Sequence, residues 1–434
     1  MLREWLILPV GPYWFYFFTA FPDTLTSRAV NNFLLRKYQK TVNSIAFYPA
    51  IISLGFLILC GIMITLDYST QGKLIKSELV WLRLRDASTA RSIITAIAAG
   101  LLSLTVFSFS MVMIVLNQAA SQMSNRVLGQ LIGNRFQQIV LGIYIGTIIY
   151  AFFLLSTIRD VESGIYIPAL SIYLLMFFTI FDIFLFIYFL HYITQSVKYE
   201  VVIKKIVEDT LDAMKKSCPH SQPVPAQPFT HTSHFVKATE SGIYERIDLE
   251  ALQSLCSEHG IQINVVVTPG TFVLPGTPLM GVSKMIPESL EKQIIDLTSV
   301  RHNQTIQGNY FYGFSQLREI GLRALSTGVN DPGTAILSLH ALVSLFLYRS
   351  SHFPAEAVYD QQGKILIVIP EISFDALVLQ SLRPLWDYGQ DDRLFCNEMH
   401  LMCLQLQGLT SHVVFKKLLS DIEAKQSTFN ADYK

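Results

Sequence analysis

A single carboxylate lies inside a long apolar stretch that carries no other charge. Residues 165–190 contain Asp182 as their one charged residue. A carboxylate in the middle of a membrane span is costly unless it faces the interior of a helix bundle. Asp182 therefore predicts a proton or cation site, or the partner of a polar group on another span. The alternative is structural, with a protonated Asp182 hydrogen-bonded to a neighbouring helix.

Polar residues recur every seven positions along a second apolar stretch, residues 92–116, and beyond it. Positions seven apart share one face of a helix. Such a stripe favours a polar pathway, as in channels and transporters. The alternative is helix packing, because small polar residues let helices approach closely in lipid. The stripe is Ser103, Ser110, Asn117 and Ser124, and the candidate pathway residues are Ser103, Ser110, Asn117, Gln118, Gln122, Arg126 and Asp182.

A polar corner, residues 326–334, joins two apolar helix patterns. Gly328 is placed to close the first helix in a left-handed conformation. Asp331 is a good N-cap residue, and Pro332 suits the first position of the next helix. A helix start can also bind a small anionic ligand through free N–H groups. Whether the corner binds a ligand or only caps a helix stays open; its candidate residues are Arg323, Ser326, Gly328, Asn330, Asp331 and Thr334.

The sequence contains no recognisable catalytic or cofactor-binding pattern. It has no nucleophile elbow, zinc-protease motif, phosphate loop or dinucleotide fingerprint. Its five cysteines are an odd number without metal-site spacing, which favours a reducing compartment. The cysteine and histidines of residues 218–234 are too irregularly spaced for a standard zinc site. We therefore expect no enzyme activity, no cofactor and no metal.

Composition places the chain in a membrane. The 434 residues are 51% hydrophobic and 15% charged, whereas soluble proteins average about 25% charged residues. Four stretches have the roughly 20 apolar residues that a bilayer crossing needs. They are residues 44–66, 92–116, 136–158 and 165–190. The 33 basic and 33 acidic residues leave no basic excess to indicate nucleic-acid binding.

Four spans place both chain ends on one side of the membrane. Lysine and arginine are more frequent before the first span and after the fourth, which favours cytoplasmic termini. Residues 1–43 are expected to form an interfacial arm anchored by aromatic rings, with a short fifth span as the alternative. The helix of the second span is expected to continue to Asn134 and so to reach into the cytoplasm.

The remaining residues predict a cytoplasmic α+β domain. Residues 201–234 indicate a helix extension and a linker rich in proline and histidine. Residues 235–286 resemble the two halves of a barrel-sandwich unit, without the lysine that carries a cofactor in biotinyl and lipoyl domains. Residues 287–434 are expected to be mainly helical. Residues 335–348, about 14 in number, are too short to span and are expected to form a core helix.

Several stretches resemble one family. The corner reads Arg-Ala-Leu-Ser-Thr-Gly-Val-Asn-Asp-Pro-Gly-Thr-Ala from Arg323 to Ala335. This is similar to a signature of the uncharacterised bacterial membrane-protein family called domain of unknown function 2254. Residues 107–126, 141–150 and 301–313 resemble the same family. Asn125 replaces a family proline. Asn309 replaces a family aspartate, so no acid–base or metal role is expected at position 309.

The resemblance implies a membrane protein without a settled activity, and the residues themselves predict a four-span α-helical membrane domain and a cytoplasmic α+β domain. From the residues, the first hypothesis is a homo-oligomer in the lipid bilayer that lets an ion or small solute cross, gated by its cytoplasmic domain. The second is a membrane-anchored ligand-sensing or scaffold protein that transports nothing. The third, an enzyme at the membrane surface, lacks a nucleophile or a metal set.

Overall fold

The computed structural model describes residues 46–72, 74, 86–122, 135–158, 167–223, 229, 231–301, 304–410 and 412–431. The arm predicted for residues 1–43 lies outside this range, and so does Arg126. The chain divides into two compact units, the first comprising residues 1–111 and 133–191 and the second residues 112–132 and 192–434. The boundaries of the regions proposed from the sequence stay predictions.

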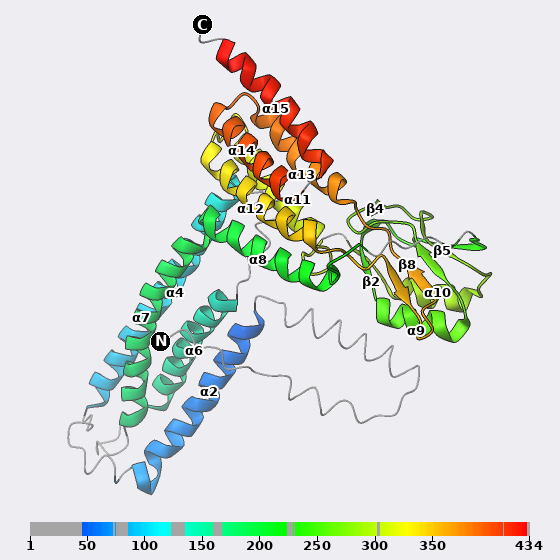
Figure 1. Cartoon of the computed structure of the whole chain (residues 1–434). Coiled ribbons are helices and arrows are strands. Elements are labelled where there is room, and N and C mark those ends of the chain that lie inside the picture. The colour runs from blue at the N-terminus through cyan, green and yellow to red at the C-terminus, as the bar shows by residue number, and fades with distance from the viewer. Residues whose placement is uncertain are drawn as a thin grey trace. The chain divides into compact units, whose positions relative to one another are not determined.

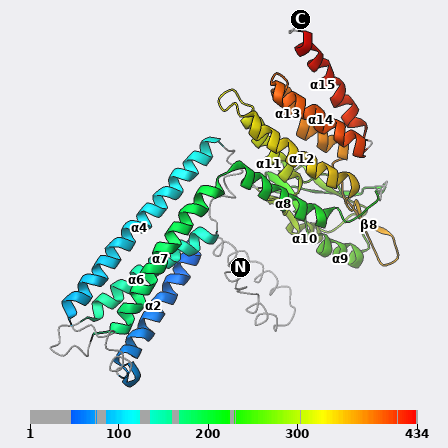
Figure 2. The same ribbon diagram turned by 60° about the vertical axis from the view of Figure 1, so that its left-hand side comes forward.

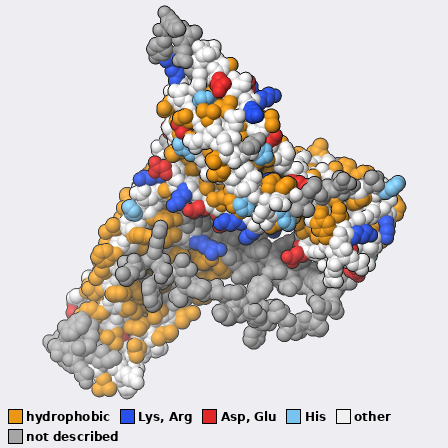
Figure 3. Space-filling model, viewed as in Figure 1, with side chains coloured by type: hydrophobic (Ala, Val, Ile, Leu, Met, Phe, Trp, Pro, Cys, Tyr) orange, Lys and Arg blue, Asp and Glu red, His pale blue; other side chains and the backbone are white. Residues whose placement is uncertain are grey.

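The first unit consists of long apolar helices (Figure 1). They are α2 (Phe47–Tyr68), α4 (Ala87–Gln122), α6 (Arg135–Thr157) and α7 (Ala169–Ser196). Each has at least 22 residues and a mean hydropathy of 2.2 to 2.4 in its most apolar window, enough to cross a hydrocarbon core of about 30 Å. Figure 3 shows hydrophobic side chains spread over the outside of this unit. The protein is therefore a multi-pass membrane protein.

Helix α6 is the most buried of these helices. Half of its apolar window is buried, against 11–22% for the other three. Two glycines let α2 approach it closely. A Cβ atom on Gly142 would lie 3.0 Å from the Pro49 Cα, and one on Gly146 would lie 2.6 Å from the Phe56 ring. Gly142 and Gly146 thus form a Gly-x-x-x-Gly contact, a common basis of tight helix packing in membranes.

A buried carboxylate joins the ends of α2 and α7. Asp67, in the last turn of α2, accepts hydrogen bonds from the backbone N–H groups of Leu170 (3.1 Å) and Ser171 (2.8 Å). The first N–H groups of a helix have no partner within the helix, so Asp67 caps α7 from a different helix. Tyr150 of α6 donates to the Ser171 carbonyl oxygen at 3.3 Å, which ties a third helix to the same point.

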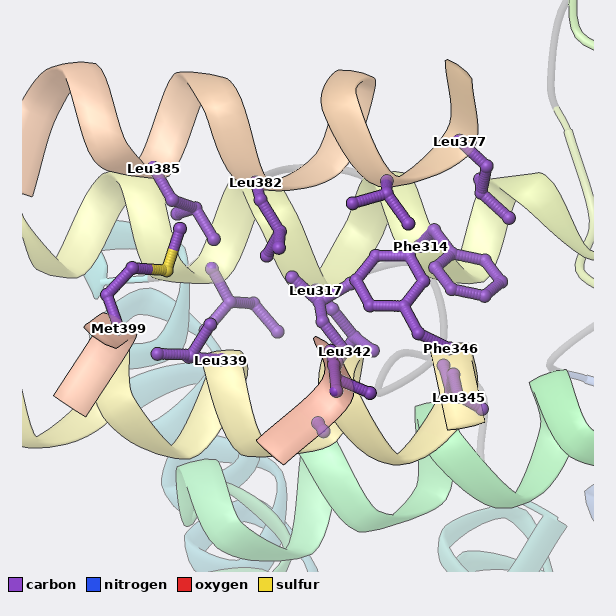
Figure 4. Close-up of a cluster of buried hydrophobic side chains, with 14 of the residues drawn as sticks. Phe314, Leu317, Leu339, Leu342, Leu345, Phe346, Leu377, Leu382, Leu385 and Met399 are labelled. Atoms are coloured by element: carbon purple, nitrogen blue, oxygen red, sulfur yellow. The ribbon is translucent and has the colours of Figure 1, made fainter. Parts of the chain in front are cut away.

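Helices of the second unit share one apolar core, part of which Figure 4 shows. They are α8 (Tyr199–Ser217), α11 (Phe311–Ala324), α12 (Pro332–Ser351), α13 (Phe374–Gly389), α14 (Arg393–Thr410) and α15 (Val413–Ala431). Phe314 of α11 stacks on Phe346 of α12 with ring centroids 5.3 Å apart. Leu317 and Leu342 of the same two helices lie beside this pair (Figure 4).

Helix α12 is longer than the sequence analysis predicted. It has 20 residues, whereas the apolar run 335–348 has about 14, because the helix starts at Pro332 after the Asp331 cap and no breaker stops it before Ser351. With a mean hydropathy of 1.2 it becomes a fifth helix long and apolar enough to span a membrane. The argument from its shortness was therefore wrong. Leu339, Leu342 and Phe346 pack it into the helical core, and a count of four spans stays a prediction.

The second unit also contains two β-sheets. The strands are β1 (His234–Lys237), β2 (Gly242–Ile247), β3 (Ile263–Val265), β4 (Phe272–Val273), β5 (Pro278–Val282), β6 (Thr298–Arg301), β7 (Ala357–Tyr359) and β8 (Ile365–Val368). One sheet has the order β1-β5-β3-β8-β7 and the other β4-β2-β6. Helices α9 (Leu249–His259) and α10 (Glu288–Asp296) lie beside them (Figure 2) and contribute to their shared core.

The barrel-sandwich unit expected for residues 235–286 is not confirmed. The larger sheet is completed by β7 and β8, which come much later in the chain, and Ile263 of β3 pairs in parallel with Ile367 of β8. Between strands β2 and β3, α9 ends at Gly260 in a left-handed conformation with φ +57°. The second unit is therefore an α+β unit with a mixed sheet.

Candidate intramembrane polar site

Asp182 lies on the buried face of α7, near the middle of the helix. The residues of this face recur at helical spacing and include Leu175 and Phe189. The Asp182 side chain is fully buried, with 0% exposure. Burial inside the bundle is the placement that the cost of a carboxylate in lipid demands.

Hydroxyl groups of α6 interact with this carboxyl, and one of them also interacts with a hydroxyl of α4. Ser108 of α4 and Asp182 both interact with the Tyr144 hydroxyl of α6. Thr147, one turn further along α6, interacts with the Asp182 carboxyl. All of these side chains come from the first unit, and Ser108, Tyr144 and Thr147 are buried. We call Ser108, Tyr144, Thr147 and Asp182 the Asp182 cluster.

The polar atoms of the Asp182 cluster are poorly satisfied. Within the described residues, neither carboxyl oxygen of Asp182 has a hydrogen-bond partner of good geometry, and the same holds for the Tyr144 and Ser108 hydroxyls. The Thr147 hydroxyl donates its hydrogen to the Ile143 carbonyl oxygen at 3.0 Å, so it can only accept from Asp182. Buried polar atoms are normally hydrogen-bonded. A cluster without such bonds favours a protonated Asp182, or a small cation that takes the carboxylate as ligand.

Four of the predicted pathway residues of α4 are not part of the Asp182 cluster. Ser103, Ser110, Asn117 and Gln118 are exposed on α4. The hydroxyls of Ser103 and Ser110 donate to the Ala99 and Val106 carbonyl oxygens of the same helix. Ser103 and Ser110 therefore do not share an interior polar site with Asp182 in the single chain. Gln122 belongs to α4, but its side chain, like Arg126, is outside the described part, and the pathway role stays a prediction.

Sequence reasoning missed the partners of Asp182. Ser108 lies two positions before Ser110 and on a different face of the helix, so it is not part of the seven-residue pattern. Tyr144 and Thr147 look like ordinary residues of an apolar helix. Their polar atoms converge on Asp182 only when three helices pack with a particular rotation. The one signal available was that Tyr144 and Thr147, three positions apart, share one face of a membrane-spanning helix pattern.

The corner of the second unit is a capped helix start. Asp331 is the N-cap of α12, and its carboxylate accepts from the Thr334 N–H at 3.1 Å and the Thr334 hydroxyl at 2.6 Å. Pro332 has no N–H, and the Ala335 N–H donates to the Asp331 carbonyl oxygen. The Gly333 N–H is thus the one amide of the first turn left for a ligand among the described residues. The Asp331 carboxylate already supplies the negative charge at this helix end.

One prediction about the corner was wrong. The left-handed residue is Asn330, with φ +48°, and Gly328 does not have a positive φ. Asparagine tolerates this conformation better than other residues with a side chain. It lets the chain turn immediately before the cap, where the Asp331 N–H donates to the Ala324 carbonyl oxygen at 2.8 Å. Ser326 closes the same turn by accepting from the Asn330 N–H at 2.9 Å.

The charges around the corner are distributed over several elements. Arg323 is exposed on the last turn of α11, while Arg318 donates to the Gln380 carbonyl oxygen of α13 at 2.9 Å. Burial, with a smaller contribution from Asp331, raises the pKa of Tyr199 at the start of α8. Any role of these residues in binding a ligand stays a prediction. In the described residues all five cysteines are free and buried, and no cluster of metal-ligating side chains occurs.

Comparison with known proteins agrees with a membrane protein. Two relatives are the uncharacterized protein Mb1321c of Mycobacterium bovis and the uncharacterized protein Rv1290c of Mycobacterium tuberculosis. Each is 25% identical over 318 residues, which cover 70% of this chain and 61% of the relative. The chain thus spans less than two thirds of the length of these curated relatives. No solved structure matches it. Residues 42–404 match the family described as "Predicted membrane protein (DUF2254)", and the chain belongs to this family.

Proposed function

We propose that the protein is an oligomeric channel or transporter for an ion or small solute, and that Asp182 is its proton- or cation-binding group. The observation that carries the proposal is the Asp182 carboxyl, which is fully buried within a span helix and has no hydrogen bond of good geometry in the described residues. A buried carboxyl within a membrane span is costly, and such residues commonly mark ion and proton pathways.

The chemistry of the Asp182 cluster fits a small cation. A carboxylate, a phenol and two hydroxyls are hard oxygen ligands, which suit a proton or a group I or II cation better than an anion. No basic side chain interacts with Asp182 in the described residues. The Asp182 cluster therefore offers oxygen ligands, and no basic side chain of the described residues neutralises its carboxylate.

The stripe on α4 supports an oligomer. Ser103, Ser110 and Asn117 are exposed in the single chain, and only 11% of the apolar window of α4 is buried. A second copy packed on this face would cover the polar side chains and let them line a shared passage. Helix α4 continues from residues of the first unit into residues of the second. A rotation of this helix is the means by which the second unit gates the passage.

One observation favours the second candidate, a membrane-anchored ligand-sensing or scaffold protein. The Ser103 and Ser110 hydroxyls already donate to their own helix, so a stripe that faces lipid is less costly than its composition implies. In that case the corner of the second unit, residues 326–334, would bind the ligand or partner. In both cases we place the protein in a bacterial inner membrane with both chain ends in the cytoplasm.

Flux through liposomes that contain the purified chain tests the proposal. Uptake of protons, sodium and potassium is measured with fluorescent indicators for wild type, Asp182→Asn and Asp86→Asn. Asp86 is an exposed aspartate that caps the start of α4 through the Ser88 and Thr89 N–H groups, and asparagine caps equally well. We expect wild type and Asp86→Asn to conduct alike and Asp182→Asn to lose at least tenfold. Equal flux in all three, or none in wild type, contradicts the proposal.

A further inference from the structure

A partly buried carboxyl, Glu371, lies where the sheets and the helical bundle of the second unit are joined. The chain passes between bundle and sheets after α8, before α11, after α12 and before α13. Each passage supplies a residue to one cluster: Cys218 after α8, Tyr310 before α11, Arg349 in the last turn of α12 and Glu371 before α13. We call these residues the Glu371 cluster.

The contacts within the Glu371 cluster form a chain from a cation to a carboxyl. The Arg349 guanidinium, which is 4% exposed, donates from Nε to the Tyr310 hydroxyl at 3.2 Å. The Tyr310 hydroxyl donates to Glu371 Oε2 at 3.4 Å. A second guanidinium nitrogen of Arg349 donates to the His352 carbonyl oxygen at 3.1 Å. Arg349 therefore holds the end of α12 and, through Tyr310, the segment that leaves β8.

Backbone pairing reinforces the same junction. His220 and Phe353 form an antiparallel bridge, with N–H to carbonyl distances of 3.2 and 2.8 Å. The Ile369 N–H donates to the Glu356 carbonyl oxygen at 2.9 Å. These bonds tie the passages together without depending on charge. The Glu371 cluster is the titratable part of a joint that is otherwise made of backbone.

The groups that face Glu371 come from each neighbouring element. Arg349 lowers the pKa of Glu371 and Glu356 raises it, while burial has the largest effect and brings the pKa to about 7. Burial likewise raises the pKa of Tyr310 and, to about 11, that of Cys218. Arginine stays charged at all relevant pH values. Glu371 is thus the member of the cluster whose charge changes near neutral pH.

We propose that Glu371, Tyr310 and Arg349 form a proton-responsive latch that fastens the sheets of the second unit to its helical bundle. The latch is tight when Glu371 carries a proton and loosens when Glu371 loses it. The reason is that separation of sheet and bundle returns Glu371 to water, where its ionised form is well solvated. The proposal does not depend on transport by the first unit.

The direction of the pH effect follows from linkage. Because the joined state holds the proton more tightly than the separated state, the joined state is favoured most below the ordinary pKa of a glutamate and loses this advantage as pH rises through about 7. Between pH 5.5 and pH 8 the equilibrium constant for separation should rise on the order of tenfold. Above pH 8 it should change little.

Hydrogen–deuterium exchange of the full chain in detergent tests the latch, after correction for the intrinsic effect of pH on exchange. We expect peptides from β7 and β8 to lose protection, on the order of tenfold in rate, between pH 5.5 and pH 8 in wild type. Glu371→Gln, which mimics the protonated side chain, should keep its protection at both pH values. Glu258→Gln on the exposed surface of α9 is the matched control and should behave like wild type.

A second variant tests whether Arg349 sets the pH at which the latch loosens. Arg349→Met removes the group that lowers the pKa of Glu371, so the midpoint of the pH transition should move upward. If Glu371→Gln shows the same pH dependence as wild type, or if Arg349→Met leaves the midpoint unchanged or lowers it, the latch proposal is overturned.

Discussion

Two carboxyls of this protein, one in each unit, share a neighbour type and differ in how their charge is compensated. Asp182 and Glu371 both interact with a buried tyrosine. Glu371 accepts a hydrogen bond from its tyrosine, which in turn is held by Arg349. Asp182 has neither a hydrogen bond of good geometry nor a cation beside it in the described residues. Glu371 is thus compensated by side chains of the second unit, whereas compensation of Asp182 is left to a proton or a bound cation.

This difference separates a structural acid from one available for chemistry. Removing one member of a compensated network leaves another charge buried alone, which is strongly destabilising. Removing an uncompensated carboxyl leaves nothing behind. Stability measurements should therefore respond strongly to the Glu371 cluster and weakly to the Asp182 cluster, and flux should show the reverse.

The largest effect on stability is expected for Arg349→Met. At pH 8 this change leaves an ionised Glu371 buried without its cation, and we expect the second unit to lose about 3 kcal/mol of unfolding free energy. At pH 5 the loss should be smaller, because Glu371 is then protonated. Denaturant unfolding of the full chain in detergent, followed by tryptophan fluorescence, measures both values. A loss that is the same at both pH values would break the assignment of Glu371 as the partner.

The pH dependence of stability is the next largest effect. Because burial raises the folded-state pKa of Glu371 to about 7, its contribution is present below the ordinary glutamate pKa and is lost as pH rises through about 7. We expect wild type to fall relative to Glu371→Gln by about 1–3 kcal/mol between pH 4.5 and pH 7.5. Asp182→Asn should leave this difference unchanged. Parallel curves for wild type and Glu371→Gln would show that Glu371 is not buried as described.

The two tyrosines offer a matched pair of conservative changes. Tyr310→Phe removes a hydroxyl that bonds to both Arg349 and Glu371, so it should cost about 1–3 kcal/mol. Tyr144→Phe removes a hydroxyl without a hydrogen-bond partner in the described residues and should leave stability unchanged or slightly raised. Thermal unfolding of both variants provides the measurement. Equal losses would erase the contrast between the two clusters.

The smallest effect on stability is expected for Asp182→Asn. No hydrogen bond of good geometry is lost and the side-chain volume is kept, so the change in unfolding free energy should stay within about 1 kcal/mol. The same variant should lower flux at least tenfold. A large loss of stability with unaltered flux would assign Asp182 a structural role instead.

Much of the architecture could be predicted from local pattern. The apolar runs give α2, α4, α6 and α7, because length and the absence of charge suffice to mark a membrane span. Asp331 before Pro332 marks the start of α12, and Gly260 marks the end of α9, because capping chemistry is local. Gly328 shows the limit of such reasoning. This glycine near a helix end was expected to adopt the left-handed conformation, but Asn330 adopts it instead.

The parts that local pattern missed depend on contacts between distant residues. The parallel pairing of Ile263 with Ile367 draws β8 into a sheet that otherwise forms earlier in the chain. Asp67 looks like an ordinary acid at the end of a span, and its role as the cap of α7 needs two helix ends to meet. The Glu371 cluster likewise needs four segments to converge, so no single window of sequence contains its signal.

The central claim is that the Asp182 carboxyl is buried without compensation and holds a proton when no cation is bound. Infrared spectroscopy of the protein in lipid at pH 6, with Glu371→Gln as background, tests this directly. We predict a C=O stretching band of a protonated carboxylic acid that disappears when Asp182→Asn is added. Absence of that band, or its survival in the double variant, would contradict the account.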